Sequence, residues 1–131
     1  LMIENNIIGI ILAGGKSKRF GEDKSNIRLG NKTLLEHTID KIEKEFSEVL
    51  IITKDKKHNF KNKKIYTVND CIKGQLGPLV GILTAMKWVK DNKKNYKWIA
   101  SFPCDTPFFD TKLIAKLKLK TKDSSKKLVF F

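Results

Sequence analysis

A stretch rich in glycine and in positive charge, LAGGKSKRFGEDK at residues 12–24, combines residue types that can hold a polyphosphate. Gly14 and Gly15 have no Cβ, so consecutive backbone N–H groups can turn towards an anion and approach it closely. Arg19 and Lys24 add full positive charge, and the guanidinium offers a planar fork that fits phosphate oxygens. The stretch therefore predicts a polyphosphate-binding loop. The alternative is a glycine-rich surface turn with solvated lysines.

The spacing within this stretch excludes two common nucleotide-binding motifs. A Walker A loop requires Lys directly after its last glycine and then Ser or Thr, whereas two acidic residues separate Gly21 from Lys24. There is no G-x-G-x-x-G fingerprint either. Arg19 is one of only two arginines among the 27 basic residues, which separates it from the lysine-rich background. Arg19 is therefore a candidate phosphate ligand, and a chance occurrence in a lysine-rich loop is the alternative.

The formal net charge of +13 raises the alternative of a basic module that binds nucleic acid, because clustered Lys and Arg attract polyphosphates. The lysines are spread along the whole chain, and aromatic residues are not interleaved with them. We therefore expect no nucleic-acid partner. No apolar stretch approaches the roughly 20 residues that span a bilayer, so we also expect no membrane partner and a cytoplasmic location.

The cysteines and histidines lack the spacing of metal ligands. Cys71 and Cys104 are far apart and form no CxxC pair, so neither a zinc site nor a disulfide framework is expected. His37 falls within a helical pattern, and His58 falls within a lysine-rich stretch. We interpret both histidines as structural or solvated residues.

Strand and helix patterns alternate along the 131 residues, a length typical of one domain. Short apolar runs rich in β-branched residues predict strands buried on both faces, and apolar residues three and four apart predict amphipathic helices. The strands are expected at 7–13, 49–53, 64–68, 97–102 and 126–131, and the helices at 33–46, 77–92 and 110–120. This alternation predicts an α/β fold, a three-layer α/β/α domain with a mostly parallel, Rossmann-like sheet.

Two of the expected helices carry further signals. Pro78 suits the first turn of the helix at 77–92, and Asp110 is the expected cap of the helix at 110–120. The apolar residues expected to form one side of the helix at 77–92 are Leu79, Ile82, Leu83, Met86 and Val89.

Three loops leave the carboxyl ends of the expected strands, at residues 14–31, 69–77 and 103–109. Open parallel sheets bind ligands outside those ends, so we expect the three loops to converge on one site. Asp70 and Asp105 lie in the second and third loops. The alternative for each is a cap or turn residue.

The glycine-rich stretch resembles the signature of Rossmann-like nucleotidyltransferases, and in particular of the molybdenum cofactor guanylyltransferase family. That family shows L-A-G-G, then Arg, an apolar residue, Gly and an Asp-Lys pair. The matching residues here are Leu12 to Gly15, Arg19, Phe20, Gly21, Asp23 and Lys24. Asn69-Asp70, GPLVGI at 77–82 and PCDTPF at 103–108 resemble the later motifs in the same order. Cytidylyltransferase relatives have L-A-A-G, so Gly14 favours guanine.

The resemblance implies that GTP and molybdopterin, or the molybdenum cofactor, react to give the guanine dinucleotide cofactor and pyrophosphate. It implies catalytic roles for Arg19, Lys24 and Asp105, with Asp105 also holding Mg²⁺. The residues that it implies for nucleotide binding are Leu12, Ala13, Gly14, Gly15, Lys24, Asp70, Gly77, Pro78, Leu79, Gly81 and Asp105. It further implies transient contact with other molybdenum cofactor proteins.

Residues 1–131 are expected to form a single nucleotidyltransferase domain that lacks the C-terminal part of the family fold. We accordingly expect this chain to bind GTP and to make little dinucleotide product. One alternative is another nucleotidyltransferase of the same fold, acting on CTP or a sugar phosphate. The other is the basic nucleic-acid-binding module.

Overall fold

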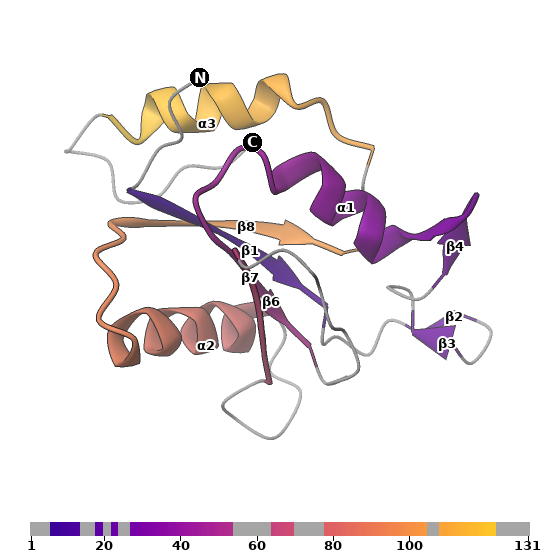
Figure 1. The fold of residues 1–131 in the computed structure, drawn as a ribbon, viewed down its shortest axis with the longest axis horizontal. Helices are drawn as coiled ribbons and strands as arrows, with labels where there is room; N and C mark the ends of the chain where they lie inside the picture. The colour runs from indigo at the N-terminus through magenta and orange to yellow at the C-terminus, as the bar shows by residue number, and fades with distance from the viewer. Residues whose placement is uncertain are drawn as a thin grey trace.

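A four-stranded parallel sheet forms the centre of the molecule, as the computed structural model shows (Figure 1). Its strands are β1 (Ile7–Leu12), β6 (Val49–Ile52), β7 (Ile65–Val68) and β8 (Trp98–Pro103), in the order β7-β6-β1-β8. The structure describes residues 6–13, 18–19, 22–23, 27–53, 64–69, 78–104 and 108–122. The first four expected strands are confirmed to within two residues at each end, whereas the strand expected at 126–131 lies outside the described residues.

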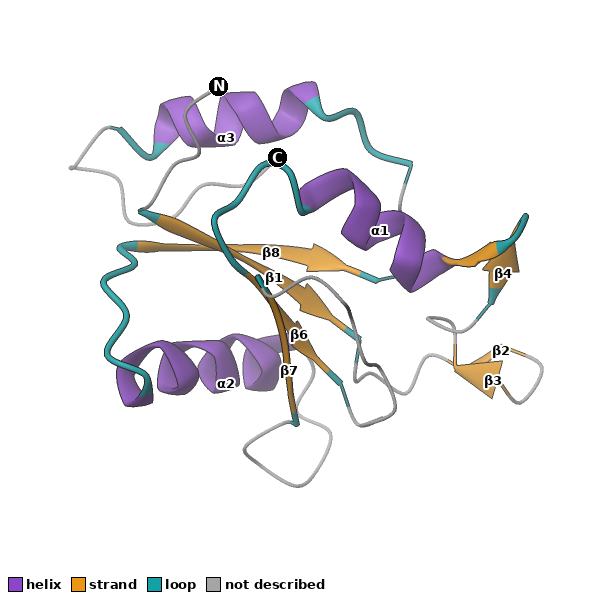
Figure 2. Cartoon of the chain, in the orientation of Figure 1, coloured by secondary structure: helices purple, strands orange, loops and turns teal. Residues whose placement is uncertain are grey.

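Helices cover both faces of this sheet (Figure 2). Helices α1 (Leu34–Ile42) and α3 (Lys112–Lys120) lie on one face, and α2 (Pro78–Asp91) lies on the other. Alternate side chains of β1 enter the two cores, since Ile7 and Ile11 pack towards α1 and α3 whereas Ile8 and Ile10 pack towards α2. The predicted three-layer α/β/α arrangement with a parallel sheet is confirmed.

Helix α1 begins at a capping box and ends earlier than expected. Thr33 accepts a hydrogen bond at Oγ1 from Glu36 N (3.1 Å), and the Glu36 carboxylate accepts one from Thr33 N (3.3 Å). The expectation of a helix to residue 46 was wrong, because the helix ends at Ile42 and a turn follows. The turn returns the chain to the core, where the Phe46 ring is fully buried against Gly9 of β1.

Helix α2 faces the sheet with its small residues. Gly81 and Ala85 are buried, whereas Leu79 is 72% exposed, Leu83 46% and Met86 54%. The expectation that Leu79, Leu83 and Met86 share one side with the partly buried Ile82 and Val89 was therefore wrong. Small residues let the helix approach the sheet closely, and that contact decides which face is buried.

Helix α3 (Lys112–Lys120) has Thr111 as its N-cap residue, so the expectation that Asp110 is the cap was wrong by one position. The Asp110 carboxylate accepts a hydrogen bond from Lys112 N (2.9 Å), and the Asp110 carbonyl accepts one from Leu113 N (2.9 Å). Ile114 is the buried anchor of this helix on the sheet. None of the helices in the described ranges is long and apolar enough to cross a bilayer.

Candidate active site

The sheet has a topological switch point between β1 and β8. From β1 the chain passes through α1 to β6 on one side, and from β7 it passes through α2 back to β8 on the other side of β1. The register pairs Leu12 with Pro103 at the carboxyl ends of these neighbouring strands. Crevices at switch points are where open α/β sheets bind ligands, so the carboxyl edge at Leu12 and Pro103 is the candidate active site.

The carboxyl end of β1 is held by contacts with strand β6 and with helix α2. Ala13 donates a hydrogen bond from its amide to the Ile52 carbonyl (2.7 Å) and is 2% exposed, so its side chain belongs to the core. Leu12 packs on α2, because a Cβ added to Gly81 would lie 2.5 Å from Leu12 Cδ2. Two residues expected to bind nucleotide, Leu12 and Gly81, therefore contact each other.

A short antiparallel pair follows the glycines of the first loop. In it β2 (Lys18–Arg19) pairs with β3 (Glu22–Asp23), and Arg19 lies opposite Glu22. In a Walker A motif a helix follows the loop directly. The strand pair agrees with the exclusion of that motif from the spacing of Gly21 and Lys24.

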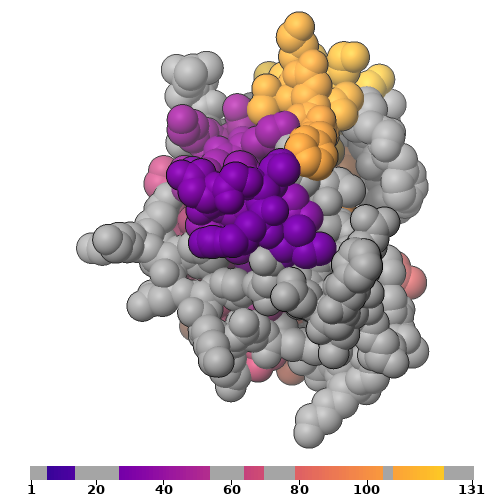
Figure 3. All heavy atoms as spheres, turned by 90° about the vertical axis from the view of Figure 1, so that its right-hand side faces the viewer, coloured from indigo at the N-terminus to yellow at the C-terminus, as the bar shows by residue number. Residues whose placement is uncertain are grey.

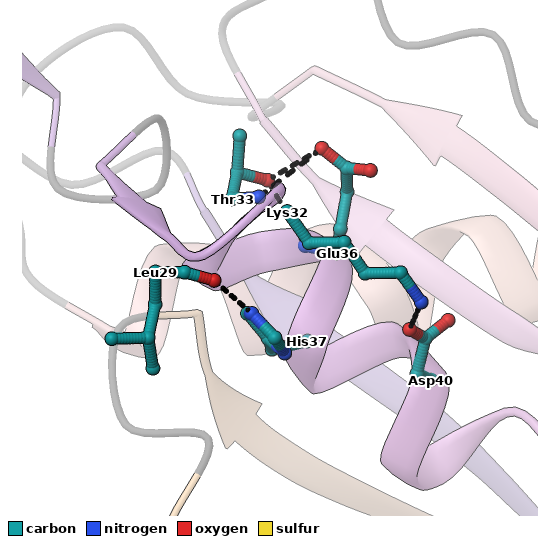
Figure 4. Close-up of polar contacts among 6 residues, drawn as sticks. All are labelled: Leu29, Lys32, Thr33, Glu36, His37 and Asp40. Atoms are coloured by element: carbon teal, nitrogen blue, oxygen red, sulfur yellow. Dashed lines mark hydrogen bonds and ion pairs between the residues drawn. The ribbon is translucent and has the colours of Figure 1, made fainter.

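A second hairpin connects the loop region to α1 (Figure 4). Strands β4 (Arg28–Leu29) and β5 (Lys32–Thr33) turn at Gly30, whose φ of 72° is in the left-handed region that glycine tolerates. His37 donates a hydrogen bond from Nε2 to the Leu29 carbonyl (2.7 Å), and the Leu34 amide donates one to the Ile27 carbonyl (2.8 Å).

The hairpin and α1 are also joined by an exposed ion pair. Lys32 donates a hydrogen bond to Asp40, whose hydrogen bond and charge raise the pKa of Lys32 above its ordinary value. His37 contributes the backbone contact described above, which agrees with its interpretation as a structural residue. No group of three or more His, Cys, Asp or Glu side chains gathers in the part of the chain that the structure describes.

The opposite, amino-terminal edge of the sheet carries a separate polar cluster. The Glu48 carboxylate accepts hydrogen bonds from Tyr96 and from Lys94 Nζ (3.1 Å). Burial raises the pKa of Glu48, but the hydrogen bonds from Tyr96, Lys94 and Tyr66 outweigh it, and the net pKa is lowered. Burial and the bond to Glu48 raise the pKa of Tyr96 to about 12. Because Glu48 and Tyr96 precede strands β6 and β8, this cluster lies away from the candidate site.

Some of the expected site residues lie within the described ranges of the structure, and the others lie outside them. Leu12 and Ala13 lie at the carboxyl end of β1, Arg19 lies in β2, and Pro78, Leu79 and Gly81 lie in the first turn of α2. Leu79 is exposed and Gly81 is buried. The expected residues that lie outside the described ranges are Gly14, Gly15, Lys24, Asp70, Gly77 and Asp105.

Comparison with known proteins identifies relatives over most of the chain. The molybdenum cofactor guanylyltransferase of Yersinia pseudotuberculosis is 33% identical over 116 residues, which cover 88% of this chain and 57% of the relative. The chain thus spans little more than half the length of that relative.

Solved structures share the fold at lower identity. A homologue of Rv0371c from Mycobacterium sp. strain JC1 superposes with a TM-score of 0.71 and 22% identity, covering 92% of this chain and 62% of that chain. Rv0371c of Mycobacterium tuberculosis, solved in complex with manganese, gives a TM-score of 0.58 and 15% identity over 89% of this chain and 60% of that chain. The family model of the MobA-like NTP transferase domain matches residues 9–131, and the chain belongs to that family.

Proposed function

We propose that this chain binds GTP and Mg²⁺ at the carboxyl edge of its sheet and transfers GMP to molybdopterin or the molybdenum cofactor, releasing pyrophosphate. The observation that carries the proposal is the pairing of Leu12 with Pro103 at the switch point. Gly14 follows Leu12 by two residues, and Asp105 follows Pro103 by two residues. Two residues of extended chain reach at most about 7 Å, so we expect Gly14 and Asp105 to lie close to the paired strand ends.

The reaction needs two phosphates to be aligned and their charge to be offset. The terminal phosphate of the pterin attacks the α-phosphorus of GTP, the bond to the β-phosphate oxygen breaks, and pyrophosphate leaves. Of the expected residues 12–15, Gly14 and Gly15 would cradle the triphosphate with their backbone amides, since the Ala13 amide is bonded to the Ile52 carbonyl and Leu12 belongs to β1. Arg19 and Lys24 would stabilise the charge of the leaving pyrophosphate. Holding both substrates at one edge makes the attack effectively intramolecular.

A divalent cation fits the donor that this edge provides. Asp105 offers hard carboxylate oxygens, which Mg²⁺ prefers, and it follows β8, a strand paired with β1 along its whole length, by two residues. Bound there, Mg²⁺ would offset the repulsion between the two phosphates. The carboxylate of Asp105 would hold it at the carboxyl edge of the sheet.

The first turn of α2 supports a role in binding the nucleoside. Gly77, Pro78, Leu79 and Gly81 belong to the GPLVGI motif, and Asp70 follows β7 by two residues. Leu79 is 72% exposed, so its side chain is accessible to a base or ribose. Gly81 would act indirectly, by setting how closely α2 approaches Leu12. Contact with other molybdenum cofactor proteins would accompany delivery and release of the pterin.

The proposal is tested by nucleotide-dependent stabilisation. Thermal unfolding is measured with GTP, CTP, ATP or UTP at equal concentration, with Mg²⁺ or with EDTA. Binding to the native state raises its stability by mass action, so Mg²⁺ with GTP should raise the melting temperature most. An equal rise of the melting temperature with CTP would contradict the guanine assignment, and a larger rise with CTP would favour a cytidylyltransferase.

Two further measurements complete the test. A short RNA duplex at low and high salt provides the control for a basic module, because salt-dependent stabilisation by RNA without any nucleotide effect would contradict the proposal. Product formation is then measured as pyrophosphate released from GTP on addition of molybdopterin. It is recorded separately from binding, because this chain aligns with only 57% of its guanylyltransferase relative.

A further inference from the structure

Two side chains of α1 hold the chain on either side of Asp105. Thr38 Oγ1 lies 3.3 Å from the Cys104 carbonyl oxygen, and Lys41 Nζ donates a hydrogen bond to the Phe109 carbonyl oxygen (2.7 Å). We propose that Thr38 and Lys41 are positioning residues that orient the Asp105 carboxylate for Mg²⁺ and the nucleotide phosphates. This inference rests on the proposed function, because it takes Asp105 as the metal ligand.

Thr38 acts on the peptide unit to which Asp105 is attached. The Cys104 carbonyl and the Asp105 amide belong to one planar peptide unit. A hydrogen bond to that carbonyl therefore restricts the orientation of the peptide plane that leads to Asp105. The Thr38 hydroxyl also lies 3.0 Å from the Leu34 carbonyl oxygen of its own helix. Thr38 is fully buried and Cys104 is 8% exposed, so the contact is shielded from water.

The choice of threonine at position 38 is informative because the surrounding face is apolar. Leu35, Ile39 and Ile42 form the buried face of α1 together with Thr38. A valine would fill the same volume there without a hydroxyl. The single hydroxyl proton is shared between the Leu34 carbonyl (3.0 Å) of the same helix and the Cys104 carbonyl (3.3 Å), 66 residues away along the chain. The contact to Cys104 is the one that links α1 to the segment after β8.

Lys41 fixes the other end of the segment through two contacts. Its Nζ lies 5.0 Å from the centroid of the Phe109 ring as well as bonding the Phe109 carbonyl. The Phe109 ring stacks on Phe102 of β8, with centroids 5.5 Å apart, and Phe102 meets Phe46 edge to face at 5.8 Å. Phe109 is therefore held between α1 and the strand that leads to Asp105.

Helix α1 also holds the hairpin that follows Lys24. His37 bonds the Leu29 carbonyl, and Asp40 pairs with Lys32 (Figure 4). Figure 3 looks onto the edge of the sheet at which β1 and β8 end. In this view the purple atoms of the hairpin and of the start of α1 lie beside the orange atoms of the segment that leads into α3. One nine-residue helix thus contacts both the hairpin that follows Lys24 and the residues that flank Asp105, Cys104 and Phe109.

The test uses variants that remove each contact with little change of shape. Thr38→Val removes the hydroxyl, and Thr38→Ser retains it. Lys41→Met removes the charge and the donor, and Lys41→Arg retains both. The matched control for charge is Lys44→Met in the exposed turn after α1, and the control for stability is Glu48→Gln at the opposite edge of the sheet.

The readout is GTP binding by calorimetry over a series of Mg²⁺ concentrations. Loss of an outer contact to a metal ligand weakens metal affinity about 10- to 100-fold. Thr38 and Lys41 act on the backbone beside Asp105, so we expect Thr38→Val and Lys41→Met to raise the Mg²⁺ concentration at half-maximal binding by about tenfold, the lower end of that range, with GTP affinity in EDTA unchanged. The Ser and Arg variants should lie close to the parent, and both controls should match it, because a loss of stability alone does not alter the Mg²⁺ dependence.

The outcomes separate this inference from the proposed function. If Asp105→Asn loses the Mg²⁺ dependence while Thr38→Val and Lys41→Met keep that of the parent, the positioning role is wrong and the proposed function stands. If the parent shows no Mg²⁺ dependence, or Asp105→Asn behaves like the parent, the metal role of Asp105 is wrong and the positioning role falls with it. Should Thr38→Val fail to fold, the Lys41→Met and Lys41→Arg pair decides.

Discussion

Gly81 of α2 lies directly against the side chain of Leu12 in β1. A Cβ added at Gly81 would stand 2.5 Å from Leu12 Cδ2 and 3.8 Å from Ile52 Cγ2. The close approach joins the GPLVGI segment to the end of the strand that leads into the glycine-rich loop. The position of α2 and the position of the loop are therefore coupled through one pair of residues.

Gly81→Ala should weaken GTP binding with little net effect on the free energy of unfolding. Alanine gains about 1 kcal/mol of helix propensity over glycine, and this gain offsets the displacement of the flexible end of Leu12. Leu12 must then move at the edge that we propose binds the nucleotide, and GTP binding should weaken for that reason. Urea unfolding and GTP titration measure the two effects.

A double-mutant cycle provides the control for that prediction. Leu12→Ala removes the atom that the new Cβ meets, so the effects of the two substitutions on GTP binding should be coupled by at least about 0.5 kcal/mol. Additive effects would mean that Leu12 and Gly81 act independently.

Gly9→Ala should destabilise the fold. The added Cβ would lie 2.8 Å from Phe46 Cδ2 and 3.1 Å from Phe46 Cγ. Unlike the end of Leu12, the Phe46 ring is fully buried and is held by Phe102 and by Lys118 Nζ, 5.3 Å from its centroid. Overpacking of this kind costs about 1–3 kcal/mol of the free energy of unfolding, which urea unfolding measures. Phe46→Leu in the same chain should recover part of the loss, and an unchanged midpoint for Gly9→Ala would disprove the contact.

The Glu48 cluster should make the fold sensitive to acid. Because the pKa of Glu48 is lowered in the folded state, its contribution to stability is present above its ordinary pKa of 4.5 and is lost as the pH falls through the folded value. The melting temperature of the parent should therefore drop more steeply below about pH 5 than that of Glu48→Gln. Parallel curves for the two proteins would show that Glu48 does not contribute.

The strands and the layer order follow from the sequence because short apolar runs, rich in β-branched residues, alternate with helical patterns. Ile7 to Leu12 has the pattern of a strand buried on both faces, and Val49 to Ile52 in the neighbouring β6 repeats it. The two short hairpins were not predicted. Lys18–Arg19 and Arg28–Leu29 are two-residue strands of mostly charged composition, with no alternation to mark them.

Tertiary packing, which local sequence patterns do not encode, determines which face of α2 is buried and which side chains of α1 contact the segment near Asp105. Leu79 and Met86 have the spacing of a core stripe, but Gly81 and Ala85 take the sheet face because they allow the closer approach. In the candidate site, Thr38 gave a usable signal as a hydroxyl on an apolar helix face, whereas Lys41 has none, since its sequence context matches that of other surface lysines. Its role depends on Phe109, 68 residues away.

The most direct test of the account is a calorimetric titration of GTP into this chain, with Mg²⁺ and then with EDTA. The account predicts saturable binding to a single site that is stronger with Mg²⁺ than with EDTA, and stronger for GTP than for CTP under the same conditions. Asp105→Asn should reduce the Mg²⁺-dependent part and leave the fold intact. Absence of saturable GTP binding, or binding that is indifferent to both Mg²⁺ and the base, would contradict a guanylyltransferase site at this edge of the sheet.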